Sequence, residues 1–117
     1  KEDALTDFFH EIVAGYIREC REEQVGRFHE RSSIIHALKY FDRYSVFILK
    51  LVDAKLLYII QDAMNDYMMK RIMPHYKIPV YELYFYGGAL LNVFIQWEKN
   101  GKREPAEMIA DQITAQL

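Results

Sequence analysis

The sequence predicts an all-α protein, a single bundle of about five to six helices. Apolar residues recur at three- and four-residue steps along most of the 117 positions, which is the period of an amphipathic helix. Sustained alternation of apolar and polar residues between hairpin turns, which a sheet would require, is missing. With 51% hydrophobic residues, a chain of this length can bury one core but not two, so residues 1–117 are predicted to form one domain.

The first helix is predicted to span roughly 20 residues and to be amphipathic on one side. Charged residues occupy its other side, and it should stop near Gln24 or Val25, just before Gly26. Its apolar positions are Leu5, Phe8, Phe9, Ile12, Val13, Tyr16, Ile17 and Cys20.

Two shorter apolar segments follow. Ser32 or Ser33 is a suitable N-cap for a helix whose apolar positions lie within 34–41. A break near Asp42 should separate this helix from residues 44–52, which are too apolar to form a solvent loop.

The longest helix is predicted to begin at Asp53, a good N-cap residue, and to end at Ile72. Pro74 and Pro79 should bracket its end, because proline cannot donate the helical hydrogen bond and disfavours helix in the residue before it.

Two helices close the chain. Residues 80–99 form a helix that is apolar almost all the way round, and Gly101 offers the left-handed residue that ends it. Pro105 starts the last helix, predicted over 106–116. Its apolar stripe is Met108, Ile109, Ile113 and Leu117.

Charge and composition exclude several classes of function. The 15 basic and 17 acidic residues give a net charge of −2, which is no electrostatic footprint for nucleic acid or an anionic membrane. No apolar run approaches the roughly 18 residues of a membrane span. Cys20 is the single cysteine, so no internal disulfide can form. We expect a soluble, cytoplasmic protein, and the start at Lys1 suggests a piece of a longer chain.

Motifs for catalysis or metal binding are weak. Gly87-Gly88 lacks the lysine and the serine or threonine of a phosphate-binding loop, and neither a nucleophile elbow nor a CxxC motif occurs. Asp7 and His10 have a spacing that can share a metal, but a dinuclear site needs that pattern twice. We therefore expect no metal, no cofactor and no enzymatic activity.

The other candidate reactive side chains have ordinary explanations. His29 and His36 are expected to face water or to cap carbonyl groups, and His75 is expected to play a similar part. Cys20 ends an apolar stripe, which favours a buried, unreactive thiol.

Aromatic residues and methionines are numerous, and each of them singly is best explained as core filling. Together, tyrosine hydroxyls and adaptable methionines are also compatible with an apolar pocket that contains a few polar points. Gly87-Gly88 in mid-helix costs about 1 kcal/mol per glycine relative to alanine, which suggests close approach of another helix or of a ligand.

The closing segment resembles the C-terminal domain of TetR-type transcriptional regulators, most of all the branch common in Firmicutes. The matching positions are Gly87, Gly88, Ile95, Trp97, Asn100, Gly101, Pro105, Glu107, Met108 and Ala110. The order of helices agrees over nearly the whole chain, but the motif itself covers only the last third. Such regulators carry an N-terminal helix-turn-helix domain that binds DNA, and this chain has none, so the resemblance implies the sensing and dimerising half.

The resemblance implies a homodimer paired through the last two helices, which would cover the outer side of the all-round apolar helix. The candidate interface residues are Gly88, Leu91, Ile95, Met108, Ile109, Gln112 and Ile113. It also implies an apolar or aromatic effector bound between the helix from Asp53, the helix from Val80 and the first helix. The candidate lining residues are Tyr16, Phe47, Tyr58, Met64, Tyr67 and Tyr84.

An alternative is a helical homodimeric interaction module that binds a protein partner and no small molecule. A small helical enzyme is disfavoured because the polar residues are scattered along the sequence. The identity of the effector, the operator, and whether the regulator represses or activates are not encoded in these patterns.

Overall fold

The computed structural model of the protein describes residues 2–27 and 29–115, and within these ranges every regular element is helical. The predicted bundle of about five to six helices is therefore confirmed. The elements are α1 (Glu2–Glu22), α2 (Arg31–Asp42), α3 (Ser45–Asp53), α4 (Leu57–Tyr67), the π-helix η1 (Met68–Ile72), α5 (Met73–Tyr76), α6 (Val80–Lys99) and α7 (Ala106–Thr114).

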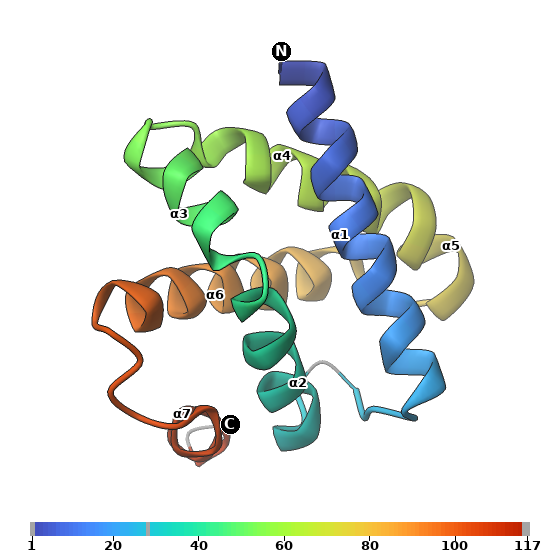
Figure 1. Ribbon diagram of the computed structural model, residues 1–117. Coiled ribbons are helices and arrows are strands. Elements are labelled where there is room, and N and C mark those ends of the chain that lie inside the picture. The colour runs from blue at the N-terminus through green and yellow to red at the C-terminus, as the bar shows by residue number, and fades with distance from the viewer. Residues whose placement is uncertain (1, 28, 116–117) are drawn as a thin grey trace.

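Helix α6 crosses the middle of the molecule, and α4 runs beside it in the opposite direction (Figure 1). Helix α1 packs across α4, whereas α2 lies against α6 and carries α7 on its other side. The core lies where these helices meet, because their apolar stripes have no other place to be buried. Its most deeply buried side chains are Ile34, Leu38, Ile48, Ile60 and Leu83.

Three helices end in the same hydrogen-bonded turn, with a left-handed residue just past the helix. The residues are Gln24 (φ 52°), Lys55 (φ 62°) and Gly101 (φ 78°). At each end the next residue donates its N–H to a carbonyl five positions back, as Leu56 does to Leu51 at 2.8 Å. The left-handed residue predicted at Gly101 is present, whereas after α1 this position belongs to Gln24 and not to Gly26.

The prediction that Asp53 caps the long helix was wrong. Asp53 is the last residue of α3, and the next helix begins at Leu57. The left-handed Lys55 turns the chain so that Leu56 joins the same core cluster as Leu51. This apolar contact across the turn is a usual companion of such a helix end and outweighs the capping preference of an aspartate.

Two further boundary predictions were wrong. Helix α2 begins at Arg31 after Glu30, so neither Ser32 nor Ser33 is its cap. The long helix does not stop at Ile72 but runs through Pro74 to Tyr76. Proline is tolerated because it directly follows the π-helical turn, where the regular hydrogen-bond ladder is already interrupted.

Helix α1 ends at Glu22, slightly before the predicted stop near Gln24 or Val25, whereas the boundaries of α3 and α6 agree with the sequence. Helix α6 has the predicted bounds, and the apolar segment 44–52 forms α3 with a shift of one residue. Helix α7 is described to Thr114, and the predicted positions Gln116 and Leu117 lie outside the described residues.

Replacing Lys55 by glycine should stabilise the fold. A non-glycine residue in the left-handed region carries a cost of roughly 1 kcal/mol that glycine avoids, so we expect the free energy of unfolding to rise by about 0.5–1 kcal/mol. Urea unfolding followed by circular dichroism measures the change. Lys50→Gly, inside α3, is the matched control, because an exposed position within a helix should lose about 1 kcal/mol instead. Equal losses in both variants would contradict the prediction.

Candidate ligand-binding cavity and pairing surface

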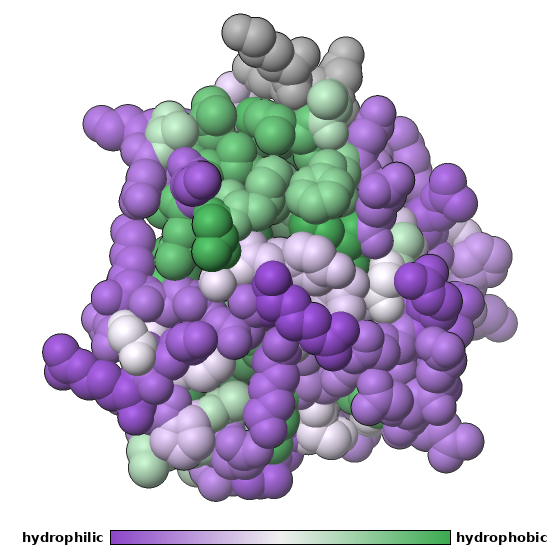
Figure 2. Space-filling model, in the orientation of Figure 1, coloured by the Kyte–Doolittle hydropathy of each residue, from purple (hydrophilic) through white to green (hydrophobic). Residues whose placement is uncertain are grey.

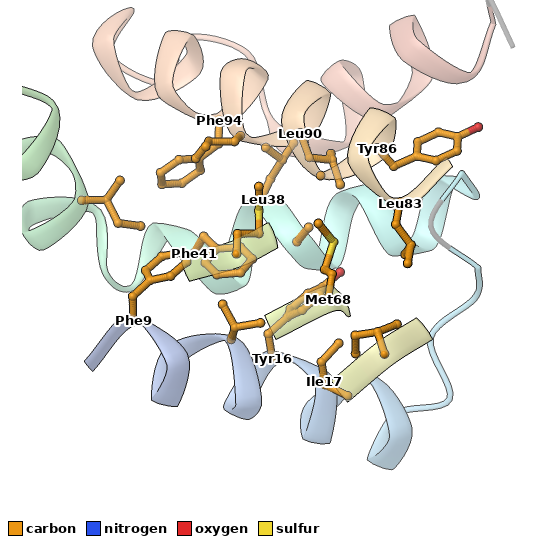
Figure 3. Close-up of a pocket in the computed structure, with 17 residues that line it drawn as sticks. Phe9, Tyr16, Ile17, Leu38, Phe41, Met68, Leu83, Tyr86, Leu90 and Phe94 are labelled. Atoms are coloured by element: carbon orange, nitrogen blue, oxygen red, sulfur yellow. The ribbon is translucent and has the colours of Figure 1, made fainter. Parts of the chain in front are cut away.

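An apolar cavity of about 100 Å³ lies at the centre of the bundle. Figure 3 shows side chains from α1 and α6 pointing toward one another across it, with α2 closing a third side. It is lined by Phe9, Val13, Tyr16, Ile17, Ala37, Leu38, Phe41, Ile48, Met64, Met68, Ile72, Leu83, Tyr86, Gly87, Leu90, Leu91 and Phe94. A dry, apolar hollow of this kind can take a small apolar group without any polar partner.

The two neighbouring glycines of α6 face different sides: Gly87 faces the cavity, and Gly88 faces away from it. A Cβ atom at Gly87 would lie 2.9 Å from Cε of Met68 and 3.4 Å from Cε of Met64, so this glycine lets the two methionines approach α6. A Cβ atom at Gly88 would meet nothing within 4 Å. The fold therefore explains Gly87, while nothing in the described chain uses the space at Gly88.

The π-helix η1 borders the cavity through Met68 and Ile72, both of which are buried. π-Helical turns inside α-helices occur frequently at functional sites. Methionine adapts its shape easily, so this wall can yield to a ligand at a lower cost than a wall of branched residues. The cavity thus has one side of irregular backbone and flexible side chains.

Two of the six predicted lining residues, Tyr16 and Met64, line the cavity. Phe47 packs edge-on against Phe8 instead, with ring centroids 4.8 Å apart. The side chains of Tyr58 and Tyr84 are exposed. Tyr67 lies beside His10, with ring centroids 6.1 Å apart.

The sequence did not reveal that α2 contributes a wall. Leu38 and Phe41 line the cavity. The sequence predicted only that they belong to the apolar face of this helix, not what that face packs against. Their helical spacing was the available signal. The spacing of one helix defines its buried face but not the helix on which that face packs.

Tyr16, whose side chain lines the cavity, carries a buried hydroxyl group. Burial raises the pKa of Tyr16 well above its ordinary value, and a hydrogen bond with Ser33 partly offsets the shift. Burial also raises the pKa of the nearby Cys20 thiol. Both groups are therefore protonated at neutral pH, where they can form hydrogen bonds but are poor nucleophiles.

The seven predicted interface residues are not equally available to a partner. Met108 and Gln112 on α7 are exposed, while Gly88, Ile109 and Ile113 are half-buried. Ile95 is only 4% exposed and belongs to the core of its own protomer. Leu91 is half-buried and lines the cavity.

The outer side of α6 carries a different set of apolar residues near its start. Tyr81 is 80% exposed and Phe85 is 61% exposed, and the exposed Tyr84 lies between them. Gly88 follows one turn later on the same side. Among the described residues, this is the part of α6 that the fold leaves least covered.

A second apolar area covers the first turns of α1 and the neighbouring α3 (Figure 2). Phe8 is 43% exposed and Val46 is 69% exposed, and the contact between Phe8 and Phe47 joins the two helices. The side chain of Leu5 is half-buried beside them. This area lies next to the N-terminal end of α1.

The histidines are placed differently from the prediction in one case. His29 and His75 are exposed, but His36 is largely buried and stacks on Tyr16 with ring centroids 5.4 Å apart. Its Nε2 atom lies 3.6 Å from the Glu19 carboxylate. His36 was predicted to face water or cap a carbonyl group, but it lies inside α2 on the side that packs against Tyr16 and Glu19 of α1.

One group of side chains has the composition of a metal site. Glu19, Glu23 and His36 bring three ligand atoms within 4.8 Å of one another. Both carboxylate oxygens of Glu19 already accept hydrogen bonds from Arg43, at 2.8 and 3.0 Å, and Glu23 is exposed. The guanidinium group of Arg43 holds the pKa of Glu19 below its ordinary value, and so takes the place that a cation would have. His10 of the predicted Asp7–His10 pair lies 3.8 Å from Asp66 instead.

Two carboxyl groups meet where α2 and α6 end. A hydrogen bond from Glu98 lowers the pKa of Asp42, and Lys102, which forms an ion pair with Asp42 at 3.0 Å, lowers it further. Burial, followed by the bond to Asp42, raises the pKa of Glu98 to about 7. The buried Oε2 atom of Glu98 has no donor partner among the described residues, so a proton shared with Asp42 is what satisfies it.

The stability of the fold should therefore fall as the pH rises from about 5 to about 8. Glu98 binds its proton more tightly in the folded chain, so its contribution is complete below 4.5 and is lost as the pH passes 7. Screening by water reduces the loss to about 1 kcal/mol. In Glu98→Gln, whose amide can donate to Asp42 at every pH, the free energy of unfolding should stay level over this range. Urea unfolding at several pH values measures it.

Glu107→Gln is the control for this measurement. Its carboxylate is paired with Lys39 at the surface, which lowers its pKa, so it titrates below the range that is tested. A wild-type slope that persists in Glu98→Gln and vanishes in Glu107→Gln would contradict the assignment.

Comparison with known proteins gives no further guide. No family model, no curated protein and no solved structure matches this chain. None of the helices described is both long enough and apolar enough to cross a membrane.

Proposed function

We propose that this chain is the sensing and dimerising domain of a TetR-type transcriptional regulator, which binds an apolar or aromatic effector and transmits its presence to an N-terminal DNA-binding domain. The observation that carries this proposal is the apolar cavity, because α1 and α6 face each other across it. In the proposed molecule, α1 joins the DNA-binding domain and α6 joins the partner. A ligand between the two helices would therefore act on both.

The proposed signal passes along α1. Four cavity residues, Phe9, Val13, Tyr16 and Ile17, belong to this helix, so filling the cavity would press on its buried face. The apolar area around Phe8 and Val46 lies beside the start of α1 and offers a surface on which a preceding domain could pack. Two DNA-reading domains must meet half-sites about 34–36 Å apart, so a small shift of α1 would change operator binding.

The effector must bind one arrangement of α1 better than the other, because equal affinity for both shifts no equilibrium. The side chains that line the cavity can produce this difference in affinity. Met64 and Met68 can repack around a guest, whereas Leu38 and Phe94 are held in the core. Expansion toward the methionines would then be coupled to the position of α1, which packs across α4.

Titration with small apolar compounds tests the sensing function. Indole and naphthalene should raise the midpoint of thermal unfolding of the wild type by a few degrees, as preferential binding to the folded chain requires. Ala37→Leu fills the cavity from α2 and should abolish the shift while circular dichroism shows an unchanged fold. Ala89→Leu, on the exposed side of α6, is the matched control. The absence of any shift in the wild type would overturn the sensing function.

Sedimentation at micromolar concentration tests the pairing. The wild type should sediment at twice the 14.0 kDa mass of the chain. Gly88→Glu places a charge on the open side of α6 and should give a monomer, because an unpaired charge buried in an interface is costly. Gln61→Glu, an exposed change on α4, should leave the dimer intact. A monomeric wild type would contradict the proposal.

The alternative is a homodimeric module that docks a protein partner and binds no small molecule. This alternative is supported by three neighbouring exposed aromatic residues, because grouped exposed apolar side chains are typical of surfaces that bind a partner. The residues are Tyr81, Tyr84 and Phe85. In this case no apolar compound would raise the unfolding midpoint, while the dimer would persist. The two experiments above therefore separate the two functions.

A further inference from the structure

A second hollow, of about 740 Å³, adjoins the central cavity. It lies between the end of α1, the connection to α2, and the turn from α5 into α6, and it opens to solvent. Ile17 and Ile72 line both hollows, so these two side chains form the wall between them. Ile17 and Leu83 lie together at the end of the cavity that faces the connection after α1 (Figure 3).

The outer hollow differs from the cavity in its charge. Arg21, Arg27 and Lys77 line it, against the carboxylates of Glu30 and Glu82. None of these five side chains forms an ion pair within the described part of the chain. Three cations against two anions make this region positive in a chain whose net charge is −2. A surface that gathers cations and leaves them unpaired is suited to an anion.

One of these cations, Arg21, is held in place by its contacts, and a second, Lys77, lies at the end of α5. The Nε–H of Arg21 donates to the Tyr76 hydroxyl at 2.9 Å, and the guanidinium carbon lies 5.8 Å from the centre of the same ring. Lys77 has a left-handed backbone with φ 51°, a conformation that costs a non-glycine residue free energy and is often found at functional sites. Both residues line the outer hollow.

We propose that the effector is an amphiphilic anion, with its apolar part in the central cavity and its charged headgroup at Arg21, Arg27 and Lys77. This proposal rests on the proposed sensing function and narrows its ligand class. The central cavity alone supplies no charged group, whereas the outer hollow places charged groups beside apolar side chains such as Ile17, Ile72 and Ile78. Their shared wall allows one molecule to use both.

Of the two side chains in the shared wall, Ile72 is 2% exposed and fixed in the core, whereas Ile17 is only half-buried. Passage between the two hollows therefore depends on Ile17. A change of the Ile17 rotamer would join the two spaces without unfolding a helix. Since Ile17 belongs to α1, a chain threaded past it would also hold that helix in one position. The headgroup would then contribute to the same signal as the apolar part.

Calorimetric titration with octanoate, octyl phosphate and octanol tests this proposal, because the three probes share one chain and differ in the headgroup. Neutral octanol should bind the wild type at least about tenfold more weakly than the tighter of the two anions, as expected for a charge-assisted contact. The tighter anion identifies the headgroup as a carboxylate or a phosphate. Added salt should reduce the preference for the anions.

The double variant Arg27→Gln/Lys77→Gln should bring octanoate, octyl phosphate and octanol to within about threefold of one another, while octanol binding stays unchanged. Arg103→Gln, an exposed change outside both hollows, is the matched control and should behave as the wild type. Equal binding of octanol and the anions to the wild type would overturn the anionic headgroup and leave the apolar sensing function standing. If none of the three probes binds, the amphiphilic anion is overturned, while the titration with indole and naphthalene decides the sensing function separately.

Discussion

Leu38→Ala should lower the free energy of unfolding by about 3–5 kcal/mol, one of the two largest effects that we expect in this protein. Leu38 is 1% exposed and lines the central cavity from α2. Truncation removes buried methyl groups and also enlarges a space that the surrounding helices already leave open. Little collapse can follow, so the cost should lie at the upper end of the range for such changes. Urea unfolding followed by circular dichroism measures it.

The same variant should bind apolar compounds more tightly than the wild type. A larger dry cavity admits benzene-sized guests, and binding to the folded state returns part of the lost stability. Ile60→Ala is the control, because Ile60 is 0% exposed in the core but does not line the cavity. It should be destabilised by a similar amount without the same response to naphthalene. An identical response in both variants would show that the cavity has no special part in binding.

Trp97→Ala should destabilise the fold by about 3–5 kcal/mol as well. Trp97 is 7% exposed, and its indole N–H donates to the carbonyl of Glu104 at 2.8 Å. The side chain therefore fills the core at the end of α6 and also fixes the connection that leads into α7. Without it, α7 should lose its defined place against α2.

Trp97→Phe separates the two contributions. Phenylalanine keeps most of the apolar volume but cannot donate to Glu104, so the loss should be about 1–3 kcal/mol. Circular dichroism is the suitable probe, because the chain contains a single tryptophan and these variants remove its fluorescence. A phenylalanine variant as unstable as the alanine variant would assign the whole effect to the hydrogen bond.

Helix α6 illustrates how well local patterns can be read. Its bounds were predicted from Val80 to Lys99, because a mostly apolar segment, an asparagine-glycine stop and a following proline are all local signals. The boundary at Asp53 was wrong for the opposite reason. There the choice of the turn depended on burying Leu56 with Leu51, a contact that helix propensity does not contain.

The residues of the candidate site were likewise predictable only in part. Tyr16 and Met64 were selected from their spacing and line the cavity, whereas Tyr58 and Tyr84 have similar sequence surroundings and are exposed. Ile95 was assigned to a partner but is buried within its own protomer. The side of a helix that faces the core follows from its period, but for a helix that is apolar all round the period gives no direction.

The sequence by itself determined the all-helical class and the bounds of α6, a helix that is apolar almost all the way round. These properties follow from composition and from contacts between residues three or four positions apart. The tertiary structure alone decided that α2 walls the cavity, that Gly87 faces Met68 while Gly88 faces outward, and that an unpaired cationic hollow adjoins the apolar one. Each of these depends on segments far apart in the chain, whose relative placement is fixed by the packing of whole helices.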